Sequence, residues 1–235
     1  MIYYLIFDTE TTGLPKKNDF SLINMIELGY IILDEDFKIV KESNSLVKGD
    51  FEIPEIITKL TGITKNKTDE GDNIDIVLKE FINDIRSVDY ILAHNNRFDL
   101  GILKKEMERL NNIYYYNNIV NKKINLDTIP IFKTYIDKNK IENYKLQTVF
   151  NHFYNKEDFI QTHRAIDDCH MVYKSLLYMK NNNFCINNYF VNKPLNFGKF
   201  KTKNIRYIYQ NHPDYFKFLF NKVYRINYVK FLKFL

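Results

Sequence analysis

The sequence predicts an α/β fold, a mixed sheet covered by helices, for most of the 235-residue chain. Apolar runs rich in aromatic and branched side chains fill residues 1–10, 25–34 and 37–47, and turn residues bound each of them. Such runs are typical of consecutive strands joined as a meander. From residue 74 onward, apolar side chains at helical spacing alternate with short apolar runs. A meander followed by alternating helices and strands indicates a mixed sheet with helices on its faces.

The remaining elements are predicted from the same two periodicities. Pro54 and Gly62 are the expected punctuation at the start and end of a short helix. The elements predicted after the meander are helices at residues 54–64, 74–86, 98–110, 144–154 and 165–181, and strands at residues 88–94 and 124–132.

Composition divides the chain into a large domain over residues 1–184, a linker over 185–196 and a small module over 197–235. The linker region is rich in asparagine and poor in helical periodicity. Net charge is +5, but residues 193–235 hold ten Lys or Arg and one acid, so the tail is basic and the body mildly acidic. A basic tail favours a polyanionic partner, above all nucleic acid, although a solvated basic face has the same composition.

Cysteine usage and hydropathy indicate a soluble intracellular protein. Cys169 and Cys185 are too few and too late in the chain for a disulfide framework or a zinc site. The N-terminal apolar run reaches Asp8 and Glu10 too early for a signal peptide. No stretch approaches the roughly 20 apolar residues of a spanning helix, so no membrane partner is expected. The expected location is the cytoplasm, a nucleoid or a viral replication site.

Two carboxylates end the first predicted strand. Side chains alternate between faces along a strand, so Asp8 and Glu10 point the same way, at the carboxyl end where α/β sheets open onto ligands. Adjacent carboxylates repel each other unless a divalent cation lies between them, and hard oxygen ligands suit Mg²⁺ or Mn²⁺. A solvated strand end is the alternative interpretation.

Two further acids face inward on predicted helices. At about 100° per residue, Asp99 lies within about 40° of the apolar face of its helix. Asp168 falls within about 40° of Val172, which directs it to the core. Asp167 instead falls within about 20° of Lys174, which directs it to solvent. A carboxylate on a packed helix face needs a partner, which can be a metal ion, a basic side chain or a helix cap.

These acids and a nearby histidine suit an in-line phosphoryl displacement. Two metal ions a few Å apart, held by four acids, can activate water and steady the leaving oxygen. His163 precedes the last helix, and an unperturbed pKa of about 6.5 suits histidine to accept the proton of that water. The candidate acids are Asp8, Glu10, Asp99 and Asp168.

Three short motifs make this chemistry more specific. "FDTETTGL" at residues 7–14, "AHNNRFDLGIL" at 93–103 and "HRAIDDCH" at 163–170 resemble the exonuclease motifs of the DEDDh (DnaQ-like) superfamily, whose third motif is His-x-Ala-x-x-Asp. The likeness is to the type of the epsilon proofreading subunit and exodeoxyribonuclease X. It covers residues 1 to about 180, with the motifs in family order and at family-like intervals.

The resemblance implies a role for each matching residue. It makes the four acids the ligands of two Mg²⁺ or Mn²⁺ ions and His163 the general base, in a ribonuclease H-like fold with a five-stranded mixed sheet. It also implies release of nucleoside 5′-monophosphates from a 3′ end. Six further residues match positions that contact the substrate in the family. The alternative role for these residues is core packing, and for His94 it is also that of a hydrogen-bonded histidine at a strand end. These residues are Thr11, Leu14, Ile63, His94, Asn95 and Phe98.

The tail, over residues 195–220, resembles the small C-terminal module of exodeoxyribonuclease X-like proteins, although Thr202 replaces a glycine usual there. Basic and aromatic side chains alternate in it, a mixture that combines phosphate attraction with base stacking. We expect an accessory that holds nucleic acid near the active site; a packed module with solvated lysines is the alternative. The candidate contacts are Lys199, Lys201, Lys203 and Arg206.

The sequence therefore predicts a metal-dependent 3′→5′ exonuclease acting on DNA, with single strands favoured. An RNA-trimming exonuclease or oligoribonuclease is the alternative among enzymes, because nothing identifies a contact to a 2′-hydroxyl. A non-catalytic, polymerase-associated subunit that binds nucleic acid is the alternative from another class, and the intact acids and His163 disfavour it. Association with a polymerase or with a second copy of the chain stays open.

Overall fold

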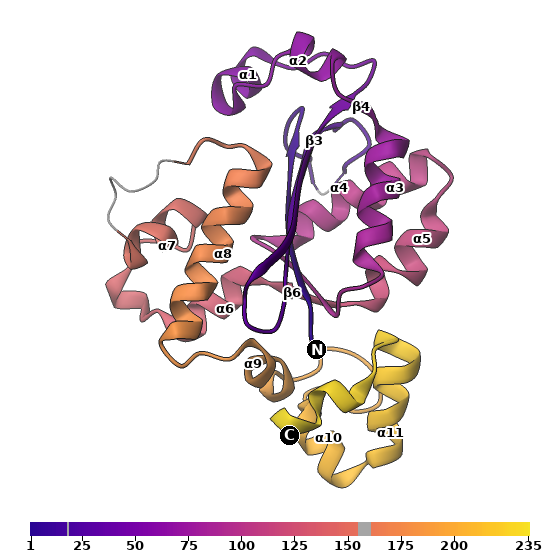
Figure 1. Ribbon diagram of the computed structural model, residues 1–235, viewed down its shortest axis with the longest axis vertical. Coiled ribbons are helices and arrows are strands. Elements are labelled where there is room, and N and C mark those ends of the chain that lie inside the picture. The colour runs from indigo at the N-terminus through magenta and orange to yellow at the C-terminus, as the bar shows by residue number, and fades with distance from the viewer. Residues whose placement is uncertain (18, 155–160) are drawn as a thin grey trace.

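A mixed sheet forms the centre of the protein, with helices on both sides (Figure 1). The computed structural model describes residues 1–17, 19–154 and 161–235. The strand order is β4-β3-β2-β1-β5-β6. The strands are β1 (Tyr4–Thr11), β2 (Met25–Leu33), β3 (Ile39–Lys48), β4 (Asp72–Asn73), β5 (Tyr90–Ala93) and β6 (Ile124–Asp127).

The first three strands form the predicted meander, and the later ones lie parallel to β1. β2 pairs antiparallel with both β1 and β3, whereas β5 pairs parallel with β1 and β6 pairs parallel with β5. The carboxyl ends of β1, β5 and β6 therefore share one edge. The predicted mixed sheet is confirmed, but it has six strands and not five. The extra strand is β4, two residues beside the end of β3 that lead directly into a helix.

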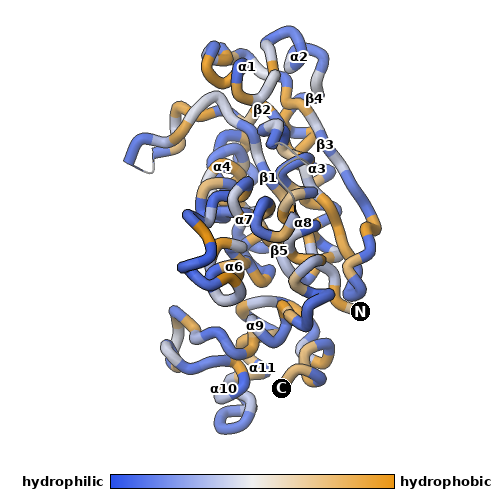
Figure 2. The backbone as a smooth tube through the Cα atoms, turned by 90° about the vertical axis from the view of Figure 1, so that its left-hand side faces the viewer, coloured by the Kyte–Doolittle hydropathy of each residue, from blue (hydrophilic) through white to orange (hydrophobic). Residues whose placement is uncertain are grey.

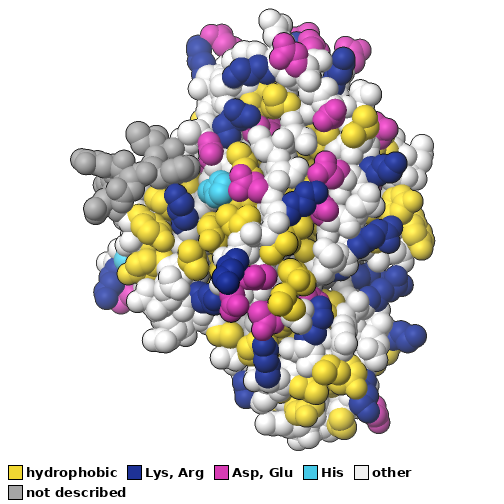
Figure 3. All heavy atoms as spheres, viewed as in Figure 1, with side chains coloured by type: hydrophobic (Ala, Val, Ile, Leu, Met, Phe, Trp, Pro, Cys, Tyr) yellow, Lys and Arg dark blue, Asp and Glu magenta, His cyan; other side chains and the backbone are white. Residues whose placement is uncertain are grey.

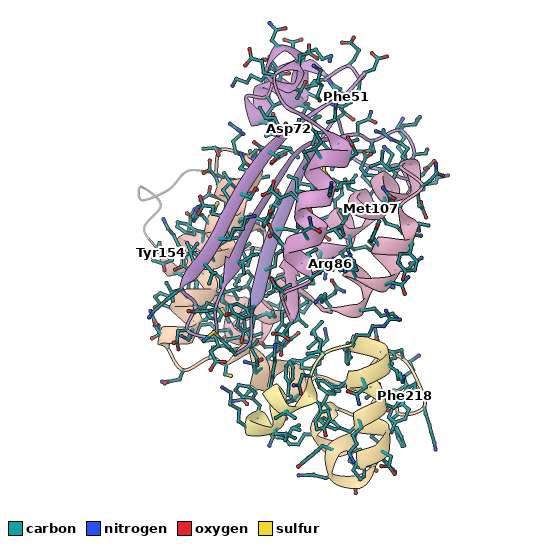
Figure 4. All side chains as sticks on the ribbon, turned by 45° about the vertical axis from the view of Figure 1, so that its right-hand side comes forward. Phe51, Asp72, Arg86, Met107, Tyr154 and Phe218 are labelled. Carbon is teal, nitrogen blue, oxygen red and sulfur yellow. The ribbon has the colours of Figure 1, made fainter. Side chains whose placement is uncertain are left out.

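Helices on the two faces of the sheet bury separate apolar cores. On one face, α3 and α4 cover Leu5 and Phe7 of β1; on the other, α6, α7 and α8 cover Tyr4 and Ile6. Figure 2 shows the second group, and Figure 4 shows labelled Met107 and Tyr154 on opposite sides of the sheet. The helices are α1 (Glu55–Thr61), α2 (Lys65–Asp69), α3 (Ile74–Ile85), α4 (Asn96–Arg109), α5 (Ile113–Asn118), α6 (Thr128–Tyr135), α7 (Leu146–Phe153), α8 (Ala165–Asn181), α9 (Ile186–Asn192), α10 (Ile205–Asn211) and α11 (Pro213–Phe218), with 3₁₀ helices η1 (Val120–Lys122), η2 (Lys138–Lys140) and η4 (Tyr228–Phe234) and a π-helix η3 (Leu219–Tyr224).

Two predicted elements differ from the structure in detail. The helix predicted at residues 54–64 ends at Thr61, because Gly62, with φ of 67°, ends α1. Thr64 then caps a second helix, α2, by accepting a hydrogen bond from the backbone of Lys67. The strand predicted at 124–132 ends at Asp127, whose carboxylate accepts a hydrogen bond from the backbone N of Ile129 and so begins α6. In both cases, residues that end one element or cap the next one set the observed boundary.

The linker predicted over residues 185–196 is in part a helix, so that prediction is wrong for α9. The side chain of Asn187 donates to the hydroxyl of Tyr4 over 2.7 Å and accepts from the hydroxyl of Tyr90 over 2.7 Å. Phe190 and Val191 are buried beside it. An asparagine on the packed face breaks the apolar periodicity that would have indicated a helix.

The C-terminal helices pack on the amino-terminal ends of β1 and β5. The ring of Phe231 lies 5.9 Å from that of Tyr90, and the amine of Lys230 lies 2.8 Å from the carboxylate of Asp89. One continuous apolar core joins Tyr4 to Phe231. The acids of β1 lie at the other end of that strand, so the tail and the acids occupy opposite edges of the sheet (Figure 1). Within the described ranges, no helix has the length and apolar character needed to cross a bilayer.

Candidate active site

Three of the predicted acids meet at the carboxyl end of β1. Asp8 and Glu10 continue the face of β1 that α8 covers, and Asp168 comes from the first turn of α8. One carboxylate oxygen from each lies within 4.8 Å of the others. The helix phase read from the sequence thus agrees with the structure, in which Asp168 is 7% exposed.

Asp99, in the first turn of α4, lies beside these three acids and is tied to β1. One of its carboxylate oxygens accepts hydrogen bonds from the backbone N of Thr9, over 3.0 Å, and from the Thr9 hydroxyl, over 2.7 Å. Both residues are buried. Thr9, which the sequence did not single out, therefore ties Asp99 to the strand that carries Asp8 and Glu10.

An ion pair to a buried acid holds the start of α8. Glu27 on β2 is fully buried and accepts hydrogen bonds from the Arg164 guanidinium, the backbone N of Ala165 and the side chain of Asn44. These bonds fix the residues between His163 and Asp168. Glu27 was also missed, although a lone acid in the apolar run "MIELGYIIL" was a signal that could have found it.

The loop before α8 carries the predicted base. His163 has a left-handed backbone, with φ of 52°, and its side chain lines the same pocket as the acids. Asp167 accepts a hydrogen bond from the hydroxyl of Thr162, which ties the helix to this loop. Gln161 donates to one oxygen of Asp168 over 2.7 Å. Gln161 is a further pocket residue that the sequence did not indicate.

The electrostatics of the pocket favour a bound cation. Burial, followed by the charges of the neighbouring acids, raises the pKa of Asp8 and of Glu10 well above the ordinary range. Burial likewise raises the pKa of Asp99 and of Asp168. The other oxygen of Asp168 is buried and, among the described residues, has no hydrogen-bond partner. An all-oxygen donor set with an orphaned buried oxygen fits a hard divalent ion such as Mg²⁺ or Mn²⁺.

The pocket around the acids has a volume of about 790 Å³ and contains most of the predicted substrate residues. Leu14, which is 78% exposed, and Phe98 form an apolar side of it. Thr11 and Ile63 do not line it: the Thr11 hydroxyl donates to the carbonyl of Gly13, and Ile63 is fully buried between α1 and α2. In this structure Ile63 has no surface for a base, which agrees with its alternative role in packing.

His94 lines the pocket but has no ring nitrogen left for a substrate. Its Nε2 donates to the backbone O of Tyr144 over 3.0 Å, and its Nδ1 accepts from the hydroxyl of Thr128 over 2.9 Å, which is the pattern of one neutral tautomer. Burial lowers its pKa to about 4. His94 therefore connects β5 to the segment before α7. Beside it, Asn95 is exposed at the pocket and donates its backbone N–H to Asp127.

Because His94 is held neutral, we expect it to make folding stability depend on pH. Its pKa is about 6.5 unfolded and about 4 folded, so its contribution is complete above pH 6.5 and is lost as pH falls toward 4. The loss amounts to ~3 kcal/mol over that range. Urea unfolding of His94→Gln should show a smaller decline from pH 7 to 4 than the wild type. The exposed His152→Gln is the control, and equal declines in all three proteins would contradict the assignment.

The basic residues predicted to contact nucleic acid in the tail differ in exposure and in hydrogen bonding. Lys199, Lys201 and Lys203 are exposed, and the amine of Lys203 lies 4.9 Å from the centroid of the Tyr207 ring. The guanidinium of Arg206 instead donates to Asn192 and to the carbonyls of the last two residues, so its predicted contact is corrected to an internal one. On the face in Figure 3, Lys and Arg side chains are spread out and form no single patch.

The fold places a cluster of carboxylates at the carboxyl end of β1, and comparison with known proteins identifies the family. The family model described as "Exonuclease" matches residues 5–176, so the chain belongs to that exonuclease family, as the motifs predicted. The PolC-type DNA polymerase III of Clostridium perfringens is 34% identical over 166 residues, 70% of this chain and 10% of the relative. The 3′-5′ exonuclease DinG of Staphylococcus aureus is 29% identical over 133 residues, 57% of this chain and 14% of the relative. The chain thus spans about a tenth of the length of the PolC-type relatives.

Solved structures confirm the fold. E. coli exonuclease I in a zinc-bound complex with single-stranded DNA superimposes with a TM-score of 0.65 and 17% identity, over 80% of this chain and 42% of the other. Exonuclease X in complex with 5′ overhanging duplex DNA superimposes with a TM-score of 0.55 and 18% identity, over 77% of this chain and 94% of the other. The predicted ribonuclease H-like fold is therefore confirmed.

Proposed function

We propose that the protein is a metal-dependent 3′→5′ exonuclease that removes nucleoside 5′-monophosphates from DNA, with single strands favoured. The observation that carries the proposal is the meeting of Asp8, Glu10 and Asp168 within 4.8 Å, with Asp99 beside them and His163 on the same pocket. Four acids in one recess are costly for a folded chain unless they bind cations. A protein that only binds nucleic acid does not need four acids in one recess.

Each of these residues has a defined task in the proposed reaction. The four acids would hold two Mg²⁺ or Mn²⁺ ions, which activate water and stabilise the leaving oxygen when bound. Burial lowers the pKa of His163, so its imidazole is neutral near pH 7 and can accept a proton from the attacking water. Thr9 and Glu27 hold Asp99 and the start of α8 in place. Leu14 and Phe98 offer apolar surface on which the terminal bases can stack.

DNA is the proposed substrate because several structural neighbours are complexes with DNA. In two of these neighbours, exonuclease I is bound to a dA16 oligonucleotide and exonuclease X to 5′ overhanging duplex DNA. Asn95 would contact the terminal nucleotide, and the backbone at Thr11 would lie along it. Lys199, Lys201 and Lys203 would attract more distant phosphates, at the edge of the sheet opposite the acids. The PolC-type relatives suggest a polymerase as protein partner.

The test uses the full chain with 3′-labelled and 5′-labelled oligomers of DNA and RNA. We expect nucleoside 5′-monophosphates to be released stepwise from the 3′ end of DNA in Mg²⁺ or Mn²⁺, and release to stop in EDTA. Asp8→Ala should be inactive under all conditions. Faster release from RNA than from DNA would assign the alternative substrate. The absence of metal-dependent release from either polymer would refute the enzymatic proposal.

A further inference from the structure

Two lysines line the acid pocket, and neither the family motifs nor the proposed ligands use them. Lys133 of α6 and Lys145, directly before α7, line the same pocket as Asp8 and Asp168. Both lysines are exposed, and among the described residues neither has a carboxylate within ion-pair distance. These two lysines therefore border a recess that also contains the four acids.

The part of the pocket that carries these lysines is held in place by the body of the protein. The hydroxyl of Tyr144 donates to the carbonyl of Ile136 over 2.9 Å, and the Tyr144 carbonyl accepts from His94. The amine of Lys133 lies 5.5 Å from the centroid of the Tyr144 ring. The backbone N of Lys145 donates to the side chain of Asn143 over 2.9 Å. The segment that carries the lysines is thus fixed before any substrate arrives.

The position of Lys145 does not serve the helix that follows it. It occupies the N-cap of α7 and makes no side-chain cap hydrogen bond, because an ammonium group has no acceptor to offer the helix amides. A cation there also opposes the positive end of the helix dipole. The pairing of a lysine with a helix N-terminus instead concentrates positive potential at the mouth of the pocket, where an anion would be attracted.

We propose that Lys133 and Lys145 bind the phosphates of the nucleotides that precede the scissile one, while the bases stack on the side of Leu14 and Phe98. The inference rests on the proposed exonuclease function and adds the path of the substrate strand to it. A polyanion approaching four acids is repelled by them, and two cations in the pocket lining offset part of that repulsion. The pocket lining combines acidic, apolar and basic side chains, which suit the scissile phosphate through bound cations, the bases and the preceding phosphates, respectively.

The test compares substrates with and without preceding phosphates. A 12-residue oligothymidylate has them, whereas the p-nitrophenyl ester of thymidine 5′-monophosphate has only the scissile phosphate. For Lys133→Gln with Lys145→Gln we expect KM for the oligomer to rise about tenfold, and the salt dependence of log KM to weaken by about 1.4, since each lost single-strand phosphate contact removes about 0.7. The loss of kcat/KM should be about tenfold larger on the oligomer than on the ester.

The control is Lys79→Gln, an exposed lysine on α3 across the sheet, which should behave as the wild type. Equal losses on oligomer and ester, or an unchanged KM and salt slope, would overturn the inference. If the wild type cleaves neither substrate, the proposed function fails. Anisotropy of a fluorescent oligothymidylate in Ca²⁺ then tests the role of the two lysines without catalysis. Weaker and less salt-dependent binding by the double variant would support phosphate binding by the lysines, and unchanged binding would refute it.

Discussion

Asp168→Asn is expected to reduce exonuclease turnover on the order of a thousandfold or more, whereas Asp167→Asn should reduce it less than about threefold. The two acids are neighbours in sequence but differ in position. Asp168 shares the recess with Asp8 and Glu10, and one of its oxygens is buried without a protein partner. Asp167 is partly exposed and bonds to Thr162. Steady-state rates on labelled single-stranded DNA in saturating Mn²⁺ measure the difference.

Folding controls make this comparison decisive. Asparagine has the same size as aspartate, so both variants should keep the circular dichroism of the wild type. Metal-free Asp168→Asn should also be at least as thermostable as the wild type, because it removes one of four acids that repel one another in a buried recess. Equal loss of turnover in the two variants would mean that Asp167, and not Asp168 alone, takes part in the site.

Deletion of residues 186–235 is expected to unfold the protein. The C-terminal helices cover Ile2, Tyr4 and Tyr90, each of which is at most 2% exposed. Burial of a side chain of this size contributes roughly 1.5–3 kcal/mol, so exposure of three costs ~5–9 kcal/mol. That loss is comparable to the whole stability of a typical domain, about 5–15 kcal/mol. Urea unfolding and solubility measure it, and a soluble truncated protein with wild-type stability would contradict the shared core.

Single substitutions in the tail test the same point with less disruption. Phe231 is fully buried and its ring lies 5.1 Å from that of Phe220, so Phe231→Ala should cost about 3–5 kcal/mol and lower Tm. Phe218, labelled in Figure 4, is 47% exposed on the neighbouring helix α11. Phe218→Ala should change stability by less than about 1 kcal/mol. Similar shifts in both variants would argue against tight packing of η4 on the sheet.

The sequence predicted those parts of the structure that depend on local periodicity. Residues 165–181 form one helix with the predicted bounds, because an uninterrupted apolar stripe and a polar face determine both its type and its phase. The same phase separates Asp168 from Asp167. Alternation along β1 likewise places Asp8 and Glu10 on one face.

What the sequence did not predict depends on contacts between distant residues. Glu27 and Arg164 are 137 residues apart, and nothing local in either segment indicates that they meet. His94 matched a substrate position, but its two partners, Thr128 and Tyr144, come from later segments that occupy its ring nitrogens. The helix α9 escaped detection because Asn187 forms hydrogen bonds within the core, where an apolar residue would have been the expected signal.

Gly29 lies directly opposite Asp8 in the pairing of β1 with β2, and α8 crosses the sheet at that point. A Cβ on Gly29 would lie 2.6 Å from the backbone N of Ile166 and 2.7 Å from the backbone C of Ala165. The helix can approach this closely only because the strand presents bare backbone there. The absence of a side chain on β2 therefore lets α8 bring Asp168 close to Asp8, and a single methyl group at Gly29 would push the two carboxylates apart.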